Sequence, residues 1–165
     1  MNNRSIGFIG GGRVTRILLQ GFERAGQWPG TVTVSDVSAD ALEMIRRQFP
    51  KAQTAVNDNQ KPAGCDIVFI ALHIPAIGAV LNEIKPALKP DAIIVSLAPK
   101  ISIAKIAEQT GGFRRIVRMI PNAPSIVNSG YNPLSFSEAF SETEKKEIKN
   151  WFQVLGECPE VAEDK

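Results

Sequence analysis

The sequence predicts an α/β protein in which a doubly wound, mostly parallel sheet carries helices on both faces. Strand-like and helical patterns alternate throughout residues 4–120, which is typical of sheets built from strand–helix–strand units. Residues 67–72 are apolar without interruption, as expected for a strand covered on both faces. Residues 6–9 lead directly into Gly10-Gly11-Gly12 and an amphipathic helix, so we expect the sheet to begin with a Rossmann-type βαβ unit.

Length and composition fit one globular domain over residues 1–165. The chain is 44% hydrophobic and 22% charged, and its net charge of +2 comes from 19 basic and 17 acidic residues mixed along the sequence. This mixture contains no basic arm that would indicate nucleic acid. The longest apolar runs are of strand length and the polar start lacks a signal-peptide core, so we expect a cytoplasmic protein without membrane contact.

The first third of the chain predicts three strands and two helices. After the glycines, apolar residues recur at helical spacing and the helix is expected to end at Gly26. These apolar residues are Val14, Ile17, Leu18, Phe22 and Ala25. Residues 31–35 are rich in β-branched side chains and predict a second strand, after which Ser38 is expected to cap a second helix. A weak strand at residues 53–56 and a polar stretch at residues 57–64 follow.

The middle of the chain continues the alternation. The apolar strand at residues 67–72 is followed by a helix with Pro75 in its first turn. Residues 92–95 predict another buried strand, and residues 102–109 a short helix. Residues 115–120 predict a strand that ends at a proline. We therefore expect the doubly wound sheet to extend to this point.

The last quarter of the chain predicts one more helix and an edge strand. Ser141 and Glu144 have the spacing of a capping box, and an apolar stripe continues to Leu155 before Gly156. Residues 159–162 predict a brief edge strand.

The glycine loop carries the first binding prediction. Gly10-Gly11-Gly12 permit a tight turn and a close approach of backbone N–H groups to a pyrophosphate, while the helix N-terminus adds partial positive charge. We assign these glycines, Arg13 and Val14 to cofactor binding. Thr15 occupies the slot of the third small residue of the usual pattern, which predicts a slightly displaced helix. The alternative is a tight turn without a ligand.

Ser35 and Asp36 end the second strand and predict the adenosine side of the site. An acidic residue about 20 residues past the glycines commonly accepts hydrogen bonds from the adenosine ribose of NAD. Because a carboxylate repels a 2′-phosphate, Asp36 favours NAD(H) over NADP(H). The alternative is a helix-capping or loop aspartate. Arg13 and Arg16 can meet a phosphate, which leaves NADP open.

Later strand ends predict the rest of the cofactor path, because ligands of such sheets bind at the carboxyl ends of the strands. The residues placed there are Ala71, Leu72, His73, Ala98 and Asn122. His73 either contacts the cofactor, acts as an acid or makes a structural hydrogen bond. Asn122 lies between two prolines, where its amide either contacts cofactor and substrate or belongs to an ordinary strand-ending turn.

The sequence gives little indication of a metal site or of a Ser-His-acid catalytic triad. Cys65 and Cys158 lie far apart without metal-ligand spacing, and we expect both to be buried, reduced thiols. His73 is the chain's one histidine, and no Gly-x-Ser-x-Gly elbow is present for it to serve. We therefore expect no metal site.

Taken together, these motifs resemble pyrroline-5-carboxylate reductase over nearly the whole chain. The resemblance is carried by residues 6–12, 67–72 and 118–124, with looser agreement at residues 129–130, 156–157 and 163–164. It implies hydride transfer from NAD(P)H to the C=N bond of a small cyclic imine acid, the last step of proline synthesis. It also implies a ribose contact from Asn57 or Asn59, and a position for Asn122 beside nicotinamide and substrate.

The residues that differ from the family pattern lie on the cofactor side of the sheet. Arg13-Val14-Thr15 stand where the family usually has Asn-Met-Ala, His73-Ile74 replace Lys-Pro, and Pro99-Lys100 replace Ala-Gly. Asp36-Val37 stand where NADPH-using members often have Asn-Arg, and Ile120 is inserted before the proline, or the strand is shifted by one residue. A related reductase of another imine or carbonyl substrate, or a non-catalytic dinucleotide-sensing or interaction module, therefore remains as an alternative.

The resemblance also implies a helical dimerisation domain after Glu163-Asp164 that supplies much of the substrate site and is not in this sequence. We expect either an excised nucleotide-binding domain or a natural short relative. The expected partners are a dinucleotide and a small-molecule substrate, with a homo-oligomer expected only when the helical domain is present.

Overall fold

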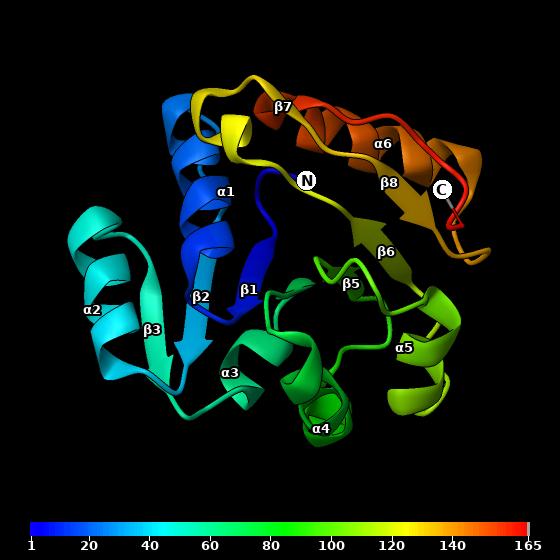
Figure 1. Ribbon diagram of the computed structural model, residues 1–165, viewed down its shortest axis with the longest axis horizontal. Coiled ribbons are helices and arrows are strands. Elements are labelled where there is room, and N and C mark those ends of the chain that lie inside the picture. The colour runs from blue at the N-terminus through cyan, green and yellow to red at the C-terminus, as the bar shows by residue number, and fades with distance from the viewer. Residues whose placement is uncertain (165) are drawn as a thin grey trace.

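A computed structural model describes residues 1–164 and contains a mixed sheet of strand order β3-β2-β1-β4-β5-β6-β8 (Figure 1). All neighbouring strands are parallel except β6 and β8, which are antiparallel. The strands are β1 Ser5–Ile9, β2 Thr31–Asp36, β3 Gln53–Val56, β4 Ile67–Ile70, β5 Ile93–Ser96, β6 Ile116–Met119 and β8 Leu134–Phe136. The predicted doubly wound α/β fold is confirmed.

Helices cover both faces of this sheet, as Figure 1 shows with α6 above and α4 below the strands. The α-helices are α1 Arg13–Arg24, α2 Ala39–Gln48, α3 Gln60–Ala63, α4 Ile74–Ile84, α5 Ile103–Gln109 and α6 Glu142–Phe152. Short 3₁₀ helices are η1 Lys85–Ala87, η2 Ala123–Val127 and η3 Gln153–Leu155. No helix within residues 1–164 is long and apolar enough to cross a membrane.

Two hydrophobic clusters divide the core by sheet face. Side chains of α1, α2 and α6 form one cluster, and those of α3, α4 and α5 form the other. Successive strand residues alternate between them, since Phe8 lies in the first cluster and Ile9 in the second. Phe8 and Phe69 face each other on β1 and β4, with ring centroids 4.4 Å apart. This stacked pair adds specific contact to the apolar burial at the centre of the sheet.

The predicted caps at Ser38 and Ser141 are confirmed, and Ser102, expected as the first helical residue, is the cap of α5. Ser38 and Ser102 accept hydrogen bonds from the backbone N–H groups of Ala41 and Lys105, which fixes the starts of α2 and α5. Ser141 and Glu144 form the predicted capping box at the start of α6.

The buried face of α1 differs from the predicted stripe. Val14 is 37% exposed, whereas Thr15 and Gly21 are buried together with Leu18 and Phe22. A Cβ on Gly21 would lie 2.6 Å from the carbonyl oxygen of Ser125. The backbone of α1 therefore lies in close contact with the backbone of η2 at Gly21. An apolar pattern does not reveal such a small-residue contact.

Several short elements were not predicted. The polar stretch at residues 57–64 contains α3, and two-residue strands β7 Gly130–Tyr131 and β9 Gly156–Glu157 pair in parallel. The expected edge strand at residues 159–162 is wrong as a regular strand, because it forms only an isolated bridge between Leu134 and Glu160. Leu134 nonetheless exchanges backbone hydrogen bonds with Pro159 and Val161, each 2.8 Å long.

Candidate dinucleotide site

The carboxyl ends of the central parallel strands place the site. β1 lies between β2 and β4, so the chain winds outward on one side through β2 and β3 and then begins again on the other side at β4. At such a reversal the loops after neighbouring strands diverge and leave a crevice in which ligands bind. The loop after β1 is the glycine loop.

Two glycines of this loop meet different constraints. Gly10 has φ +107°, and a Cβ there would lie 2.1 Å from the carbonyl oxygen of Ala71, so only glycine fits between the ends of β1 and β4. Gly12 caps the N-terminus of α1, and a Cβ there would meet nothing within 4 Å. The loop therefore packs tightly on its inner side and presents backbone to open space at the helix N-terminus.

The peptide between Gly10 and Gly11 is held at both ends. The Thr15 hydroxyl donates to the Gly10 carbonyl at 2.6 Å, and the Gly11 N–H donates to Asp36 Oδ2 at 2.8 Å. Thr15 is fully buried. A threonine in the third small-residue slot is therefore accommodated by a hydrogen bond to the loop.

Asp36 connects the second strand to the glycine loop. Its Oδ1 accepts a hydrogen bond from the backbone N–H of Ser38 at 2.8 Å, while its Oδ2 is held by the loop as described. The cap of α2 is Ser38, so the alternative of a helix-capping aspartate is wrong. The carboxylate is thus fixed at the end of β2, in the position that dinucleotide-binding folds use for the adenosine ribose.

The neighbouring polar residues have distinct roles. The buried Ser35 hydroxyl donates to Asn59 Oδ1 at 2.7 Å, and Asn59 Nδ2 donates to Glu83 Oε2 at 3.3 Å. Asn57 is exposed beside Asp36, with φ +51° and its N–H bonded to the Asp36 carbonyl at 3.0 Å. Of the two candidate asparagines, Asn57 lies at the open edge and Asn59 belongs to an internal network.

A hollow of about 250 Å³ brings six of the twelve predicted cofactor-binding residues together, whereas Gly10, Gly11, Ser35, Asp36, Asn57 and Ala98 are not in its lining. Its lining consists of Gly12, Arg13, Val14, Thr15, Ala71, Leu72, His73 and Leu97. A larger hollow of about 630 Å³ lies away from this edge, between the chain start and α6, but it has no glycine loop and no strand end in its lining. We therefore assign the site to the smaller hollow, because it lies at the reversal of strand order.

Two lining residues, Thr15 and Leu97, do not follow from the sequence. The sequence predicts a packing position for Thr15 and a cofactor contact for Ala98, the neighbour of Leu97. Ala98 is only 3% exposed and packs in the core under α4 and α5, so Leu97 is the residue that faces the hollow. The position after β5 was the available signal, but a strand end alone does not say which of two neighbours points outward.

His73 and Asn122 fall in different surroundings. His73 lines the hollow, is exposed and makes no side-chain cap hydrogen bond at the start of α4. Asn122 is not in the lining. Its Oδ1 accepts from the Tyr131 N–H at 3.0 Å, and its own N–H donates to Asn132 Oδ1 at 3.2 Å. The amide oxygen of Asn122 thus stabilises the turn that follows β6.

Both cysteines are free and buried, as expected. Burial raises the pKa of the Cys65 thiol, and raises that of Cys158 to about 11. Neither thiol is therefore a ready nucleophile near neutral pH. Among the residues that the structure describes, no group of three or more His, Cys, Asp or Glu side chains is arranged to hold a metal ion.

The fold and the glycine loop define a dinucleotide-binding domain of the doubly wound class. The chain belongs to the family described as NADP oxidoreductase coenzyme F420-dependent, whose model matches residues 5–100. The resemblance to pyrroline-5-carboxylate reductase is also confirmed. The enzyme of that name from Escherichia coli K12 is 31% identical over 162 residues, and pyrroline-5-carboxylate reductase 3 from Rattus norvegicus is 28% identical over 160 residues.

These matches cover 97% of this chain but 60% and 58% of the respective relatives, so the chain spans about 60% of their length. Among solved structures, the Coxiella burnetii pyrroline-5-carboxylate reductase has a TM-score of 0.85 at 28% identity, over 98% of this chain and 60% of the other. The NADP-bound Plasmodium falciparum enzyme has a TM-score of 0.84 at 26% identity, over 99% and 59%.

Proposed function

We propose that this chain is the cofactor-binding part of an oxidoreductase that reduces the C=N bond of a small cyclic imine acid, as a pyrroline-5-carboxylate reductase does. The observation that carries the proposal is the glycine loop, which leaves open space at Gly12 and the N-terminus of α1. Asp36 fixes the loop by accepting a hydrogen bond from the Gly11 N–H. The named reductases that match nearly the whole chain support it.

The residues present fit a nicotinamide dinucleotide. Backbone N–H groups from Gly12 onward, with Arg13 beside them, are placed to hold the pyrophosphate, and the side chains of Leu72 and Leu97 give the hollow an apolar wall. When bound, the reduced nicotinamide supplies the hydride. The chain's own part is to orient this group and to exclude water from the side that Leu72 and Leu97 cover.

We further propose a preference for NAD(H) over NADP(H). Asp36 is held beside the loop by two backbone hydrogen bonds, so its negative charge stays where a 2′-phosphate would lie. The NADP-bound Plasmodium falciparum relative and the nearby Arg13 and Arg16 support the opposite preference. Titration of the chain with NADH and NADPH by calorimetry tests the choice, and tighter binding of NADPH would contradict the Asp36 argument.

A non-catalytic dinucleotide-sensing module is the second candidate. It is favoured by Asn122, whose amide oxygen is used in a turn and which lies outside the lining of the hollow. Stopped-flow oxidation of bound NADH by 1-pyrroline-5-carboxylate separates the two. Slow but measurable hydride transfer supports the reductase, whereas tight NADH binding with no oxidation supports the sensing module. Failure to bind NADH, NADPH or ADP-ribose would contradict both.

A further inference from the structure

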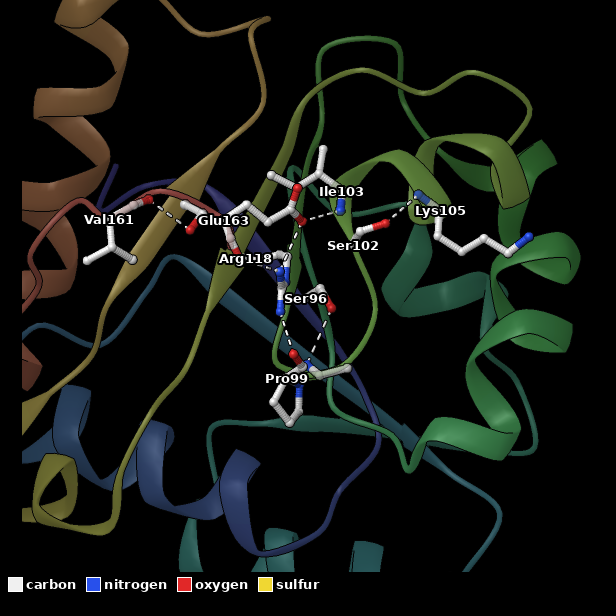
Figure 2. A network of polar contacts seen from close by, with 10 residues as sticks. Ser96, Pro99, Ser102, Ile103, Lys105, Arg118, Val161 and Glu163 are labelled. Atoms are coloured by element: carbon white, nitrogen blue, oxygen red, sulfur yellow. Dashed lines mark hydrogen bonds and ion pairs between the residues drawn. The ribbon is translucent and has the colours of Figure 1, made fainter. Parts of the chain in front are cut away.

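Arg118 on β6 joins three segments beside the cofactor edge (Figure 2). Its side chain is 11% exposed. One terminal nitrogen, Nη2, donates to the carbonyl oxygen of Pro99 at 2.6 Å, and the other, Nη1, makes an ion pair with Glu163 Oε1 at 3.0 Å. These partners are 19 and 45 residues away in the sequence, so the contact exists only in the folded chain.

Glu163 restricts the orientation of the guanidinium. The same carboxylate oxygen that pairs with Arg118 also accepts the backbone N–H of Ile103, at the first turn of α5. Figure 2 shows Glu163 between Ile103 and Arg118, with Pro99 on the opposite side of the guanidinium. A planar guanidinium fixed by a carboxylate on one side has little freedom to leave the carbonyl on the other.

The carbonyl that Arg118 holds belongs to the loop after β5. Leu97, two residues before Pro99, lines the cofactor hollow, and Ala98 between them is anchored in the core. In a doubly wound sheet the adenosine half of a dinucleotide binds over β1 and β2, and the nicotinamide half lies on the other side of the reversal. The Leu97–Pro99 loop therefore borders the half of the site where the nicotinamide is expected.

We propose that Arg118 is a positioning residue for the nicotinamide half of the cofactor. It holds the Pro99 carbonyl and thereby sets the place of Leu97 on the wall of the hollow, with Glu163 keeping the guanidinium in line. The proposal rests on the proposed function, because it presupposes a dinucleotide in this hollow. The competing explanation is an ion pair that stabilises the fold alone.

Arg118→Gln tests the proposal with two ligands. ADP-ribose has the adenosine and diphosphate of NADH but lacks the nicotinamide, so calorimetric affinities for the two ligands separate the halves of the site. We expect Arg118→Gln to weaken NADH binding about tenfold while ADP-ribose affinity stays within about twofold of wild type. The fluorescence of bound NADH should shift towards that of free NADH, because its nicotinamide is less well held.

Arg115→Gln is the matched control. Arg115 lies just before the same strand, at its opposite end, and its ion pair with Glu144 is 2.9 Å long with a side chain 24% exposed. The variant loses a comparable ion pair away from the hollow, so its affinities for NADH and ADP-ribose should equal those of wild type. Arg118→Lys, which keeps the charge but offers no fork, should give an intermediate NADH affinity.

Each outcome separates the explanations. Unchanged NADH affinity in Arg118→Gln overturns the inference, and so does an equal loss of NADH and ADP-ribose affinity, which would indicate a general loosening. If Arg118→Gln does not fold, Glu163→Gln replaces it, because the amide keeps an oxygen for Ile103 and removes only the charge facing Arg118. A wild-type chain that binds neither ligand would overturn the proposed function itself.

Discussion

At the amino-terminal edge of the sheet charged side chains pair with one another, whereas beside the glycine loop at the carboxyl-terminal edge the carboxylate of Asp36 holds backbone N–H groups. Asp66 pairs with Lys89 and Arg115 with Glu144, each at 2.9 Å, around a hollow of about 450 Å³. Asp36 instead accepts two backbone N–H groups beside a hollow of about 250 Å³. The larger and more charged hollow is not assigned as the site, because three of its five charged lining residues already pair within the protein and no residue of the glycine loop lines it.

The difference shows why size and charge alone identify sites poorly. Exposed ion pairs contribute little to the free energy of unfolding and are common on protein surfaces. The carboxylate of Asp36 accepts a hydrogen bond from the glycine loop and so restricts the backbone segment that is expected to contact a ligand. Such preorganisation lowers the cost of ordering the loop when the ligand binds.

The largest expected effect comes from the glycine loop. Gly10→Ala places a Cβ at 2.1 Å from the Ala71 carbonyl and in a strained region at φ +107°, so we expect a loss of roughly 2–4 kcal/mol in the free energy of unfolding, measured with urea. NADH binding should fall below detection.

Gly12→Ala is the matched comparison for that variant. The added methyl meets nothing within 4 Å, so the free energy of unfolding should fall by no more than about 1 kcal/mol. NADH affinity should still drop at least about tenfold, because the methyl occupies the approach of the pyrophosphate. Unchanged NADH affinity in a folded Gly12→Ala protein would contradict the placement of the cofactor.

Removal of the Thr15 hydroxyl should have the next largest effect. Thr15→Val leaves the Gly10 carbonyl without its buried donor, which should cost about 1–3 kcal/mol of stability and weaken NADH binding severalfold. Thr15→Ser keeps the hydroxyl and should retain most of the affinity. Equal affinities for the valine and serine variants would show that the loop does not depend on this bond.

Asp36→Asn should change cofactor choice and also lower stability, because the amide nitrogen cannot accept one of the two backbone hydrogen bonds that the carboxylate accepts. The neutral amide removes the repulsion of a 2′-phosphate, so the ratio of NADH to NADPH affinity should fall by about tenfold in calorimetric titrations. Asp66→Asn at the amino-terminal edge provides the comparison, because it neutralises a carboxylate that pairs with Lys89. This variant should leave the ratio of NADH to NADPH affinity unchanged.

The smallest effect is expected from pH at the amino-terminal edge. Hydrogen bonds from the backbone N–H of Ser141 and from Arg115 lower the pKa of Glu144 to about 2. Because the folded-state pKa lies below the unfolded one, the contribution of Glu144 is complete above about pH 4.5 and is lost as the pH falls towards 2. Urea unfolding at pH 7 and pH 3 should show a smaller pH-dependent loss for Glu144→Gln than for wild type.

The backbone segments that form the candidate site could be predicted from the sequence. The glycine loop, Asp36 and the ends of β4 and β5 are marked by local sequence, and the structure brings them to one edge. The side chains that complete the hollow were less accessible to prediction. Leu97 and Ala98 are chemically similar neighbours, and only the path of the loop after β5 determines that Leu97 faces the hollow.

The sequence by itself determined the alternating strands and helices, the caps at Ser38 and Ser141, and the glycine turn. These features depend on residues within a few positions of one another, whose periodicity and hydrogen-bonding chemistry can be read directly.

The tertiary structure decided the antiparallel pairing of β8, the close packing of Gly21 against η2, and the Arg118–Glu163 link to Pro99. Each of these joins segments far apart in the chain. Their energies depend on which elements become neighbours after folding, and no local pattern contains that information.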